Sequence, residues 1–515
     1  MDACASSWLP QEQYDSDRLA CEIRALVDDV IRFATAEKQR SFFSFERGLS
    51  KRVATLGCLL VALFLQFRHE RFDIAPWSER LGNKAHGKPA RRTLRTMFGE
   101  VAYWRDYFYR KRTRCHPLDI ELGLFADGFS PMVIGLMTRM ATRMSFSTSR
   151  LIFGAFLRWS PGTRTIEEMA LGLGRKAAPF MEQTATKQVG DDEILVIEAD
   201  GKATPTATEQ ELEKRRGKRK KPCEKGCACG CQRHRSRKKR AKRGTRPRRK
   251  KGDKSKNGKS ATIVAVYTLK RGEDGQYHGP YNKRIWASYA PRKVMLDWAK
   301  REAERRGIDP LTATNVHVVI DGEKCLCQGL RERFPNASVA IDIRHVEEKL
   351  WALGNQFHKE GSDELKDWVE EKRDLLYAGA IEELIESLQT EGEKIGSRGP
   401  GTKSKREKLA KVVHYLSTRV EVMKYGELIE KDLVIASGVI EGAARYVIGE
   451  RLDCSGMRWI TGRAEALLQL RCIELNGEWD RFYRWARNQI ETQQRQCLEM
   501  FRIRSNEPLP IPNGS

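Results

Sequence analysis

Three carboxylates of this chain stand where a protein could use them for chemistry. Asp200 ends an apolar, β-branched run that begins at Ile194 and has the pattern of a buried strand. Asp321 follows a similar run, Val316–Ile320, and Glu441 lies in the first turns of a late apolar helix. An Asp-Gly pair after a strand is commonly only a turn, so the prediction depends on whether these three side chains meet.

Carboxylates gathered at one point repel one another and cannot all stay ionised unless cations offset their charge. Hard carboxylate oxygens favour Mg²⁺ or Mn²⁺ as those cations. Two such ions about 4 Å apart can activate water or a 3′-hydroxyl and stabilise the leaving oxygen of a phosphoryl displacement. We therefore predict a site for two Mg²⁺ or Mn²⁺ ions, with Asp200, Asp321 and Glu441 as ligands.

Two further polar residues lie close to this set in the predicted sheet. Asp342 also follows an apolar strand, Ser338–Ile341, so it could be an auxiliary ligand or replace Asp321 as the second one. His345 could contact a phosphate or position a water. The alternative for His345 is an ordinary hydrogen-bonding role near the edge of the sheet.

A second glutamate competes with Glu441 for the third ligand position. Glu450 follows it by nine residues, which is two and a half helical turns and places it on roughly the opposite face. We therefore favour Glu441 and expect Glu450 to pair with Arg445 or Arg451.

The segments that carry these acids alternate between strand and helix patterns. Three strands come first, followed by helix, strand, helix and strand; the ranges are 194–202, 261–269, 284–290, 291–306, 316–320, a helix through 330, and 338–341. This order predicts a mixed five-stranded sheet covered by helices. If the first strand is central, it neighbours the fourth, and Asp200 and Asp321 then lie side by side.

The region before this sheet reads as helices around a small hairpin. The apolar run Val53–Phe67 is shorter than the ~20 residues of a membrane span, so we expect a buried helix. Thr93–Tyr109 predicts a hairpin that turns at Gly99, and its aromatic and arginine side chains could contact DNA or pack on neighbouring elements. Short helices across Ser130–Gln183 could form a helix-turn-helix or a plain bundle.

Most of the net charge of +25 lies in one segment. Lys214–Lys259 holds 24 Lys or Arg residues against two acids, which makes a polyanion, and nucleic acid in particular, the expected partner. The predicted DNA-binding residues are Arg215, Arg216, Lys238, Lys239, Arg240, Arg248, Arg249, Lys250 and Lys251.

The same segment contains the one cluster among the 13 cysteines. Its candidate zinc ligands are Cys223, Cys227, Cys229, Cys231 and His234. Their spacing differs from paired C-x2-C knuckles, so a basic DNA-binding loop without zinc is the alternative. The scattered remaining cysteines and the lack of a secretory signal indicate a reducing cytosol.

Several phrases of the sequence together resemble bacterial insertion-sequence transposases of the DDE class, in particular the Kra-type family, which is related to Mutator-like transposases. The resemblance covers about Thr93–Trp479 and is carried by the basic cysteine-containing insert and by the runs 198–202, 319–324, 342–345, 437–442, 450–451 and 456–459. The separations of Asp200, Asp321 and Glu441 are 121 and 120 residues. Both are long for a bare catalytic core, and the basic insert and a helical insertion account for the excess.

The resemblance implies an RNase H-like α/β core with an α-helical N-terminal region and an all-helical insertion. It also implies cleavage at the ends of a mobile element, joining to target DNA, a homo-oligomer in the active complex, no membrane, and a bacterial, nucleoid-associated cytoplasmic protein. A nuclease without strand transfer and a non-enzymatic nucleic-acid-binding protein are the alternatives. The expected regions are an N-terminal helical region (1–85), a hairpin and helical DNA-binding region (86–190), the first core part (191–345) with its basic insertion (212–259), a helical insertion (346–431), the last core helices (432–480) and a C-terminal tail (481–515).

Overall fold

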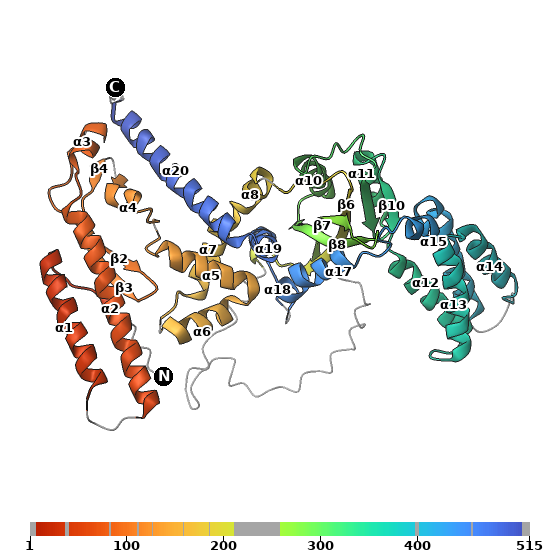
Figure 1. Cartoon of the computed structure of the whole chain (residues 1–515), viewed down its shortest axis with the longest axis horizontal. Helices are drawn as coiled ribbons and strands as arrows, with labels where there is room; N and C mark the ends of the chain where they lie inside the picture. Colours follow the sequence, from red (N-terminus) through yellow and green to blue (C-terminus); the bar gives the residue numbers. More distant parts are fainter. Residues whose placement is uncertain are drawn as a thin grey trace, which may run out of the picture. The chain divides into compact units, whose positions relative to one another are not determined.

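The computed structural model divides the chain into two compact units, one comprising residues 1–180 with 477–515 and the other residues 181–476 (Figure 1). The structure describes residues 7–36, 41–81, 84–110, 113–125, 127–157, 159–184, 186–210, 258–396, 401–454 and 457–506. Both units are described separately below.

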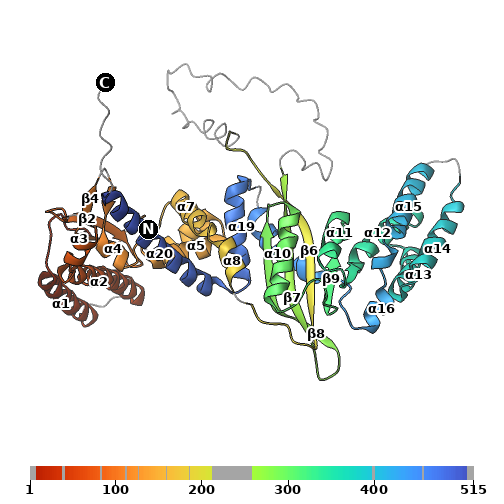
Figure 2. The same ribbon diagram turned by 90° about the horizontal axis from the view of Figure 1, so that it is seen from above.

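The second unit is built on a mixed five-stranded sheet with the order β10-β9-β6-β7-β8 (Figure 2). The central strand β6, Glu193–Pro205, is antiparallel to β7, Gly258–Arg271, which pairs in turn with β8, Tyr277–Ser288. On its other side β6 is parallel to β9, Val316–Ile320, and β9 is parallel to β10, Ser338–Ile341. The predicted five strands and the predicted neighbours are therefore confirmed.

The observed strands differ from the predicted ones mainly where they leave the core. β8 begins at Tyr277, seven residues before the predicted start. The sequence prediction missed the first half of this strand because it is polar and mostly exposed. β6 continues through Asp200 to Pro205 while still paired with β7, so the prediction that the strand ends on Asp200 is wrong. What ends there is the pairing with β9, whose last partner on β6 is Ala199.

Helices cover both faces of this sheet (Figure 1). On one face lie α10, Arg292–Arg305, and α11, Lys324–Arg333. On the other lies α17, Gly438–Ala443, which is followed by a π-helical turn, Ala444–Gly449, and α18, Glu450–Leu452. Helix α19, Thr461–Leu475, packs against β8.

A block of helices continues from the β10 edge of the sheet, where a helical insertion was predicted. Its members are α12 Ile343–Phe357, α13 Asp363–Ala378, α14 Ile381–Glu393, α15 Thr402–Ser417, the 3₁₀ turn Val420–Val422 and α16 Tyr425–Glu430. Val319 and Ile341 of the sheet belong to the same buried cluster as Leu350 and Leu384 of the helices. The insertion therefore shares a hydrophobic core with the strands that end in Asp321 and Asp342.

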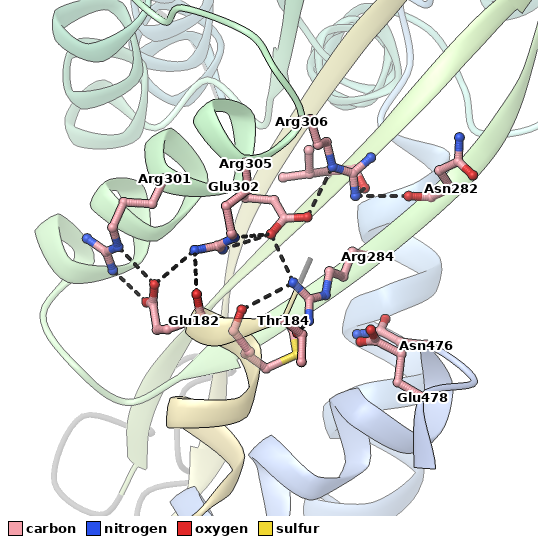
Figure 3. A network of polar contacts seen from close by, with 12 residues as sticks. Glu182, Thr184, Asn282, Arg284, Arg301, Glu302, Arg305, Arg306, Asn476 and Glu478 are labelled. Carbon is pink, nitrogen blue, oxygen red and sulfur yellow. Dashed lines mark hydrogen bonds and ion pairs between the residues drawn. The ribbon is translucent and has the colours of Figure 1, made fainter. Parts of the chain in front are cut away.

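A buried ionic network fastens α10 to β8 (Figure 3). Glu302 is 0 % exposed and accepts hydrogen bonds from Arg284 on β8 at 3.0 Å, from Arg305 at 2.8 Å and from Arg306 at 3.0 Å. Arg284 also donates to the hydroxyl of Thr184 at 2.6 Å. A buried carboxylate needs such partners because its desolvation is costly.

The first unit packs two long helices, α1 Ser16–Ala34 and α2 Phe42–Glu70, against a small sheet with the order β1-β3-β2. The strands are β1 Ser7–Trp8, β2 Ala90–Arg95 and β3 Glu100–Arg105, so the predicted hairpin is present. The other elements of this part of the chain are α3 Ala75–Leu81, β4 Phe108–Arg110, β5 Thr113–Cys115, α4 Pro117–Glu121, α5 Pro131–Arg143, α6 Phe146–Leu157, α7 Thr163–Gly174, α8 Ala177–Gln183 and α20 Trp479–Asn506.

Several aromatic and basic side chains of the hairpin are used inside the fold, although Tyr109 is 50 % exposed. Tyr103 is 0 % exposed, and its hydroxyl donates to Asp119 at 2.5 Å. Arg92 and Arg105 donate to the same carboxylate at 2.7 Å and 2.6 Å. This arrangement favours the packing interpretation of these residues over DNA contact.

Helix α2 is longer and more exposed than the sequence suggested. Of its residues only Gly57, Cys58, Leu59, Ala62, Leu65 and Gln66 are buried. Phe64 is 55 % exposed and Val53 50 %, so the prediction of a buried helix over Val53–Phe67 is wrong for one of its faces. The reason is that α1 and β3 cover only part of its circumference. By length and composition, α2 is the one helix among the described residues that could cross a membrane.

Candidate metal centre

Three aspartates occupy equivalent positions where the parallel pairing of three neighbouring strands ends. Ala199 of β6 pairs with Ile320 of β9, and Ile320 pairs with Ile341 of β10. Asp200, Asp321 and Asp342 are the next residues in each chain segment. Because the three strands run in the same direction, the three acids lie at one edge of the parallel part of the sheet.

Asp321 lies close enough to Asp200 to influence the ionisation of Asp200. Burial raises the pKa of Asp200, and the neighbouring charge of Asp321 raises it further, whereas His345 lowers it. The Oδ1 atom of Asp200 accepts the backbone N–H of Gly201 at 2.5 Å, and the Oδ1 atom of Asp321 accepts that of Glu323 at 2.9 Å. These bonds hold both carboxylates in fixed orientations.

Asp342 joins two helix starts. It is the N-cap residue of α12, where its Oδ1 atom accepts the backbone N–H of Arg344 at 2.9 Å. Its Oδ2 atom accepts the hydroxyl of Ser437, the residue just before α17. The side chain of Asp342 is 0 % exposed, so it links the first turns of α12 and α17 from inside the fold.

Asp342, His345 and Glu441 form a group that could hold a metal ion. One ligand atom from each lies within 4.8 Å of the others, with Asp342 buried, His345 half-buried and Glu441 exposed. Two ligands of one Mg²⁺ ion are at most ~4.2 Å apart, so a small side-chain rotation is sufficient for shared coordination. Burial and the nearby Asp342 raise the pKa of Glu441, while His345 lowers it.

The three predicted ligands, all of them among the described residues, do not form one group within 4.8 Å of one another. Asp200 lies beside Asp321, whereas Glu441 lies beside His345 and Asp342, which had been assigned only an auxiliary or substitute role. His345 influences the pKa of both Asp200 and Glu441, so it lies near both pairs of acids. The chemistry of the donor set, four carboxylates and an imidazole at one sheet edge, fits a divalent cation.

The helix that carries Glu441 has its apolar face on the sheet. Ile440 is 2 % exposed and Val447 and Ile448 are 0 % exposed. Glu450 pairs with Arg471 of α19 at 3.2 Å, so the prediction that it pairs with Arg445 or Arg451 is wrong. The π-helical turn after Ala443 and the packing of α19 determine that partner, and neither is visible in the local sequence.

A fifth acid, Glu198, lies within the same region and was missed by the sequence analysis. It is 0 % exposed, and its two carboxylate oxygens accept the hydroxyl of Tyr267 at 2.7 Å and the backbone N–H of Ile440 at 2.6 Å. Burial raises its pKa to about 7, and the charges of Asp342 and Glu441 contribute. The available signal was its place two residues before Asp200, on the same face of the strand.

A pocket of about 740 Å³ opens next to the turn that carries Asp321. Its lining includes the basic residues Lys324, Arg331 and Arg419 and the acidic residues Glu332 and Glu421, and Arg331 pairs with Glu421 at 3.6 Å. The guanidinium of Arg419 donates to the carbonyl oxygen of Gly322 at 3.2 Å. Gly322 has a φ of +80°, and a Cβ there would collide with the hydroxyl of Tyr415, so the turn after Asp321 requires glycine.

The remaining predicted site residues lie outside the described part of the chain. These are the candidate zinc ligands Cys223, Cys227, Cys229, Cys231 and His234 and the basic residues of the same segment. No protein-family model matches the sequence, and no curated protein is significantly similar to it. The function is therefore argued from the residues and their geometry.

Proposed function

We propose that this chain is a DNA transposase of the DDE class with an RNase H-like core and a site for two Mg²⁺ or Mn²⁺ ions. The single observation that carries the proposal is the alignment of Asp200, Asp321 and Asp342 in one row across three neighbouring parallel strands, with Glu441 of α17 beside Asp342. The resemblance to Kra-type transposases agrees with this arrangement.

The carboxylates of the site supply the oxygen ligands that divalent cations need. Burial and mutual repulsion raise the pKa values of Asp200 and Glu441, which means that the site favours added positive charge. When bound, such ions supply the Lewis acidity for phosphodiester hydrolysis and strand transfer. Hydrolysis breaks a P–O bond with water and frees a 3′-hydroxyl. This hydroxyl then attacks a phosphodiester of the target, forming a new P–O bond while the P–O bond to the target's own 3′-oxygen breaks and releases a 3′-hydroxyl.

The chain's own residues orient the substrate and hold the ligands. Asp200 and Asp321 are fixed by backbone N–H groups, and the charge of His345 partly offsets the raised pKa of Asp200 and of Glu441. Lys324 and Arg419 of the pocket beside Gly322 provide cations for phosphates of a DNA strand that approaches Asp321.

The test is a set of single substitutions assayed for cleavage, joining and DNA binding. The DNA carries the sequences that flank the gene, and a supercoiled plasmid serves as target. We expect D200A, D321A and E441A each to lower Mg²⁺-dependent nicking by at least ~10³-fold while leaving DNA binding unchanged. The matched control is D367A, an exposed carboxylate on α13.

The outcomes separate the candidate functions. Joined product from the wild type supports a transposase, whereas nicking without joining identifies a nuclease. Full nicking activity of D200A refutes the metal mechanism, whereas DNA binding by the wild type without any metal-dependent nicking identifies a non-enzymatic nucleic-acid-binding protein. Replacing Asp342 by Asn in the same assay decides whether it is a ligand or only the cap of α12.

A further inference from the structure

Glu198 is a buried carboxylate in the middle of β6 that belongs to neither pair of proposed ligands. Its position two residues before Asp200 places both side chains on the same face of one strand. Its two oxygens are engaged at 2.7 Å by Tyr267 and at 2.6 Å by Ile440, so it has no free oxygen lone pair directed at solvent.

The N–H group that Glu198 accepts has no partner within its own helix. Ile440 is the third residue of α17, and the first N–H groups of a helix lack intrahelical acceptors. Ser437, the residue in the N-cap position, makes no capping bond because its hydroxyl donates to Asp342 instead. The carboxylate of Glu198, which belongs to the sheet, therefore accepts the hydrogen bond that an N-cap side chain would normally accept in this helix.

We propose that Glu198 is a positioning residue, which caps α17 from the central strand and thereby fixes Glu441 relative to Asp200. The inference rests on the proposed metal site. The hydrogen bond connects β6 to the residue directly before Glu441, so the strand that holds one ligand also determines where the opposite ligand lies.

Tyr267 completes this arrangement from β7. It is 2 % exposed, and burial together with the Glu198 charge raises its pKa, so it stays a hydrogen-bond donor. Because Tyr267 engages the other oxygen, the carboxylate of Glu198 cannot rotate away from Ile440 without losing this bond. Partners that orient metal ligands in this way commonly change metal affinity when they are replaced.

The experiment compares two substitutions of similar volume that differ in hydrogen bonding. In E198Q the amide oxygen can still accept the Ile440 N–H, and its NH₂ group can donate to the oxygen of Tyr267. In E198L no acceptor remains, and the Ile440 N–H is left buried without a partner. If E198L does not fold, E198T gives the same comparison, since threonine suits a strand but is too short to reach Ile440.

The readout is Mn²⁺ binding by the full-length protein without DNA, followed by electron paramagnetic resonance. We expect E198L to weaken Mn²⁺ binding roughly tenfold or more and E198Q to stay within about threefold of the wild type. E441A serves as the ligand deletion, and D367A, which removes an exposed carboxylate on α13, serves as the control that should bind normally. Circular dichroism spectra of the variants report that the fold is retained.

Three results would contradict the inference or its basis, and they differ. If E441A weakens Mn²⁺ binding but E198L does not, Glu198 does not position the site. If E198Q loses affinity as severely as E198L, the charge of Glu198 acts directly and the hydrogen bond is not the cause. If E441A itself binds Mn²⁺ like the wild type, the proposed metal site is wrong, whatever the Glu198 variants do.

Discussion

The candidate site gathers several carboxylates and little positive charge. Ionisation of these carboxylates is therefore unfavourable in the folded protein. Glu198, Asp200 and Glu441 all have raised pKa values, and burial is the largest cause for each. His345 is the one residue whose charge lowers two of them. A protein that retains such a cluster without cations loses stability near neutral pH, where the carboxylates must ionise.

This cost gives a pH prediction for Glu198. Its pKa is about 7 in the folded protein against an ordinary value of 4.5, so the folded state holds the proton more tightly than the unfolded chain does. Its contribution to stability is therefore present below pH 4.5 and is lost as the pH rises to about 7, by roughly 3 kcal/mol at most. Urea unfolding in EDTA at a series of pH values measures this loss.

The control for that measurement is E198Q, which cannot ionise. We expect the stability of the wild type relative to E198Q to fall between pH 4.5 and 7 and to level off above it. Adding Mg²⁺ should reduce the fall, because bound cations offset the neighbouring charges. Parallel stability curves for the two proteins across this range would show that Glu198 keeps its proton affinity unchanged on folding.

At the residue scale the sequence indicated the acids but not their partners. Asp200, Asp321 and Asp342 could be located because each follows a short apolar strand, which is a local pattern. The pairing of Glu441 with Asp342 could not be predicted, since it depends on how α17 crosses the sheet. Glu198 was overlooked because a charged residue within an apolar strand gives no sign of its distant partners, Tyr267 and Ile440.

At the scale of elements, the attachment of α10 to β8 depends on one carboxylate. Glu302 is 0 % exposed and receives hydrogen bonds from Arg284, Arg305 and Arg306 (Figure 3). Removing it leaves Arg284 and Arg306, which are 3 % and 1 % exposed, as buried cations without this counter-charge. We expect E302Q to lower the free energy of unfolding by about 3–5 kcal/mol, measured by urea denaturation.

A neighbouring acid provides the comparison for this substitution. Glu304 is on the same helix but is exposed, so E304Q should change the unfolding free energy by less than about 0.5 kcal/mol. An E302Q protein as stable as E304Q would mean that the arginines find other partners at little cost. The network would then not be what holds α10 on the sheet.

The elements themselves were predictable where the core determines their pattern. Two strands were predicted with the observed bounds, Val316–Ile320 and Ser338–Ile341. Both are short apolar runs that are preceded and followed in the sequence by loops or helices. The first half of β8 was missed because its exposed polar residues carry no apolar alternation. Residues 481–506 were expected to be part of a tail, but they form most of α20. This helix packs against α3 and α4, and the sequence pattern did not reveal these contacts.

At the scale of the whole molecule, most of the net positive charge belongs to a sequence segment that lies outside the described residues. The basic segment lies between residue 210 and Gly258. The strands that precede and follow it, β6 and β7, are paired with each other as far as Pro205 and Gly258. Ala207 is also held, by a hydrogen bond from its N–H to the carbonyl oxygen of Trp459 at 2.9 Å. Both ends of the segment are therefore anchored to the same unit, so the sheet should tolerate its removal.

Replacing residues 211–257 by a Gly-Ser linker of about ten residues tests what the charge does. We expect DNA affinity to fall by at least about tenfold at low salt, and the dependence of log affinity on log salt concentration to become shallower, because fewer counterions are released. Fluorescence anisotropy with labelled duplex DNA at several NaCl concentrations measures both quantities. Mn²⁺ binding should remain at the wild-type level, since the carboxylates stay in place. Equal affinity and equal salt slope in the two proteins would show that DNA binds elsewhere, and Lys324 and Arg419 of the pocket beside Gly322 would be the next residues to neutralise.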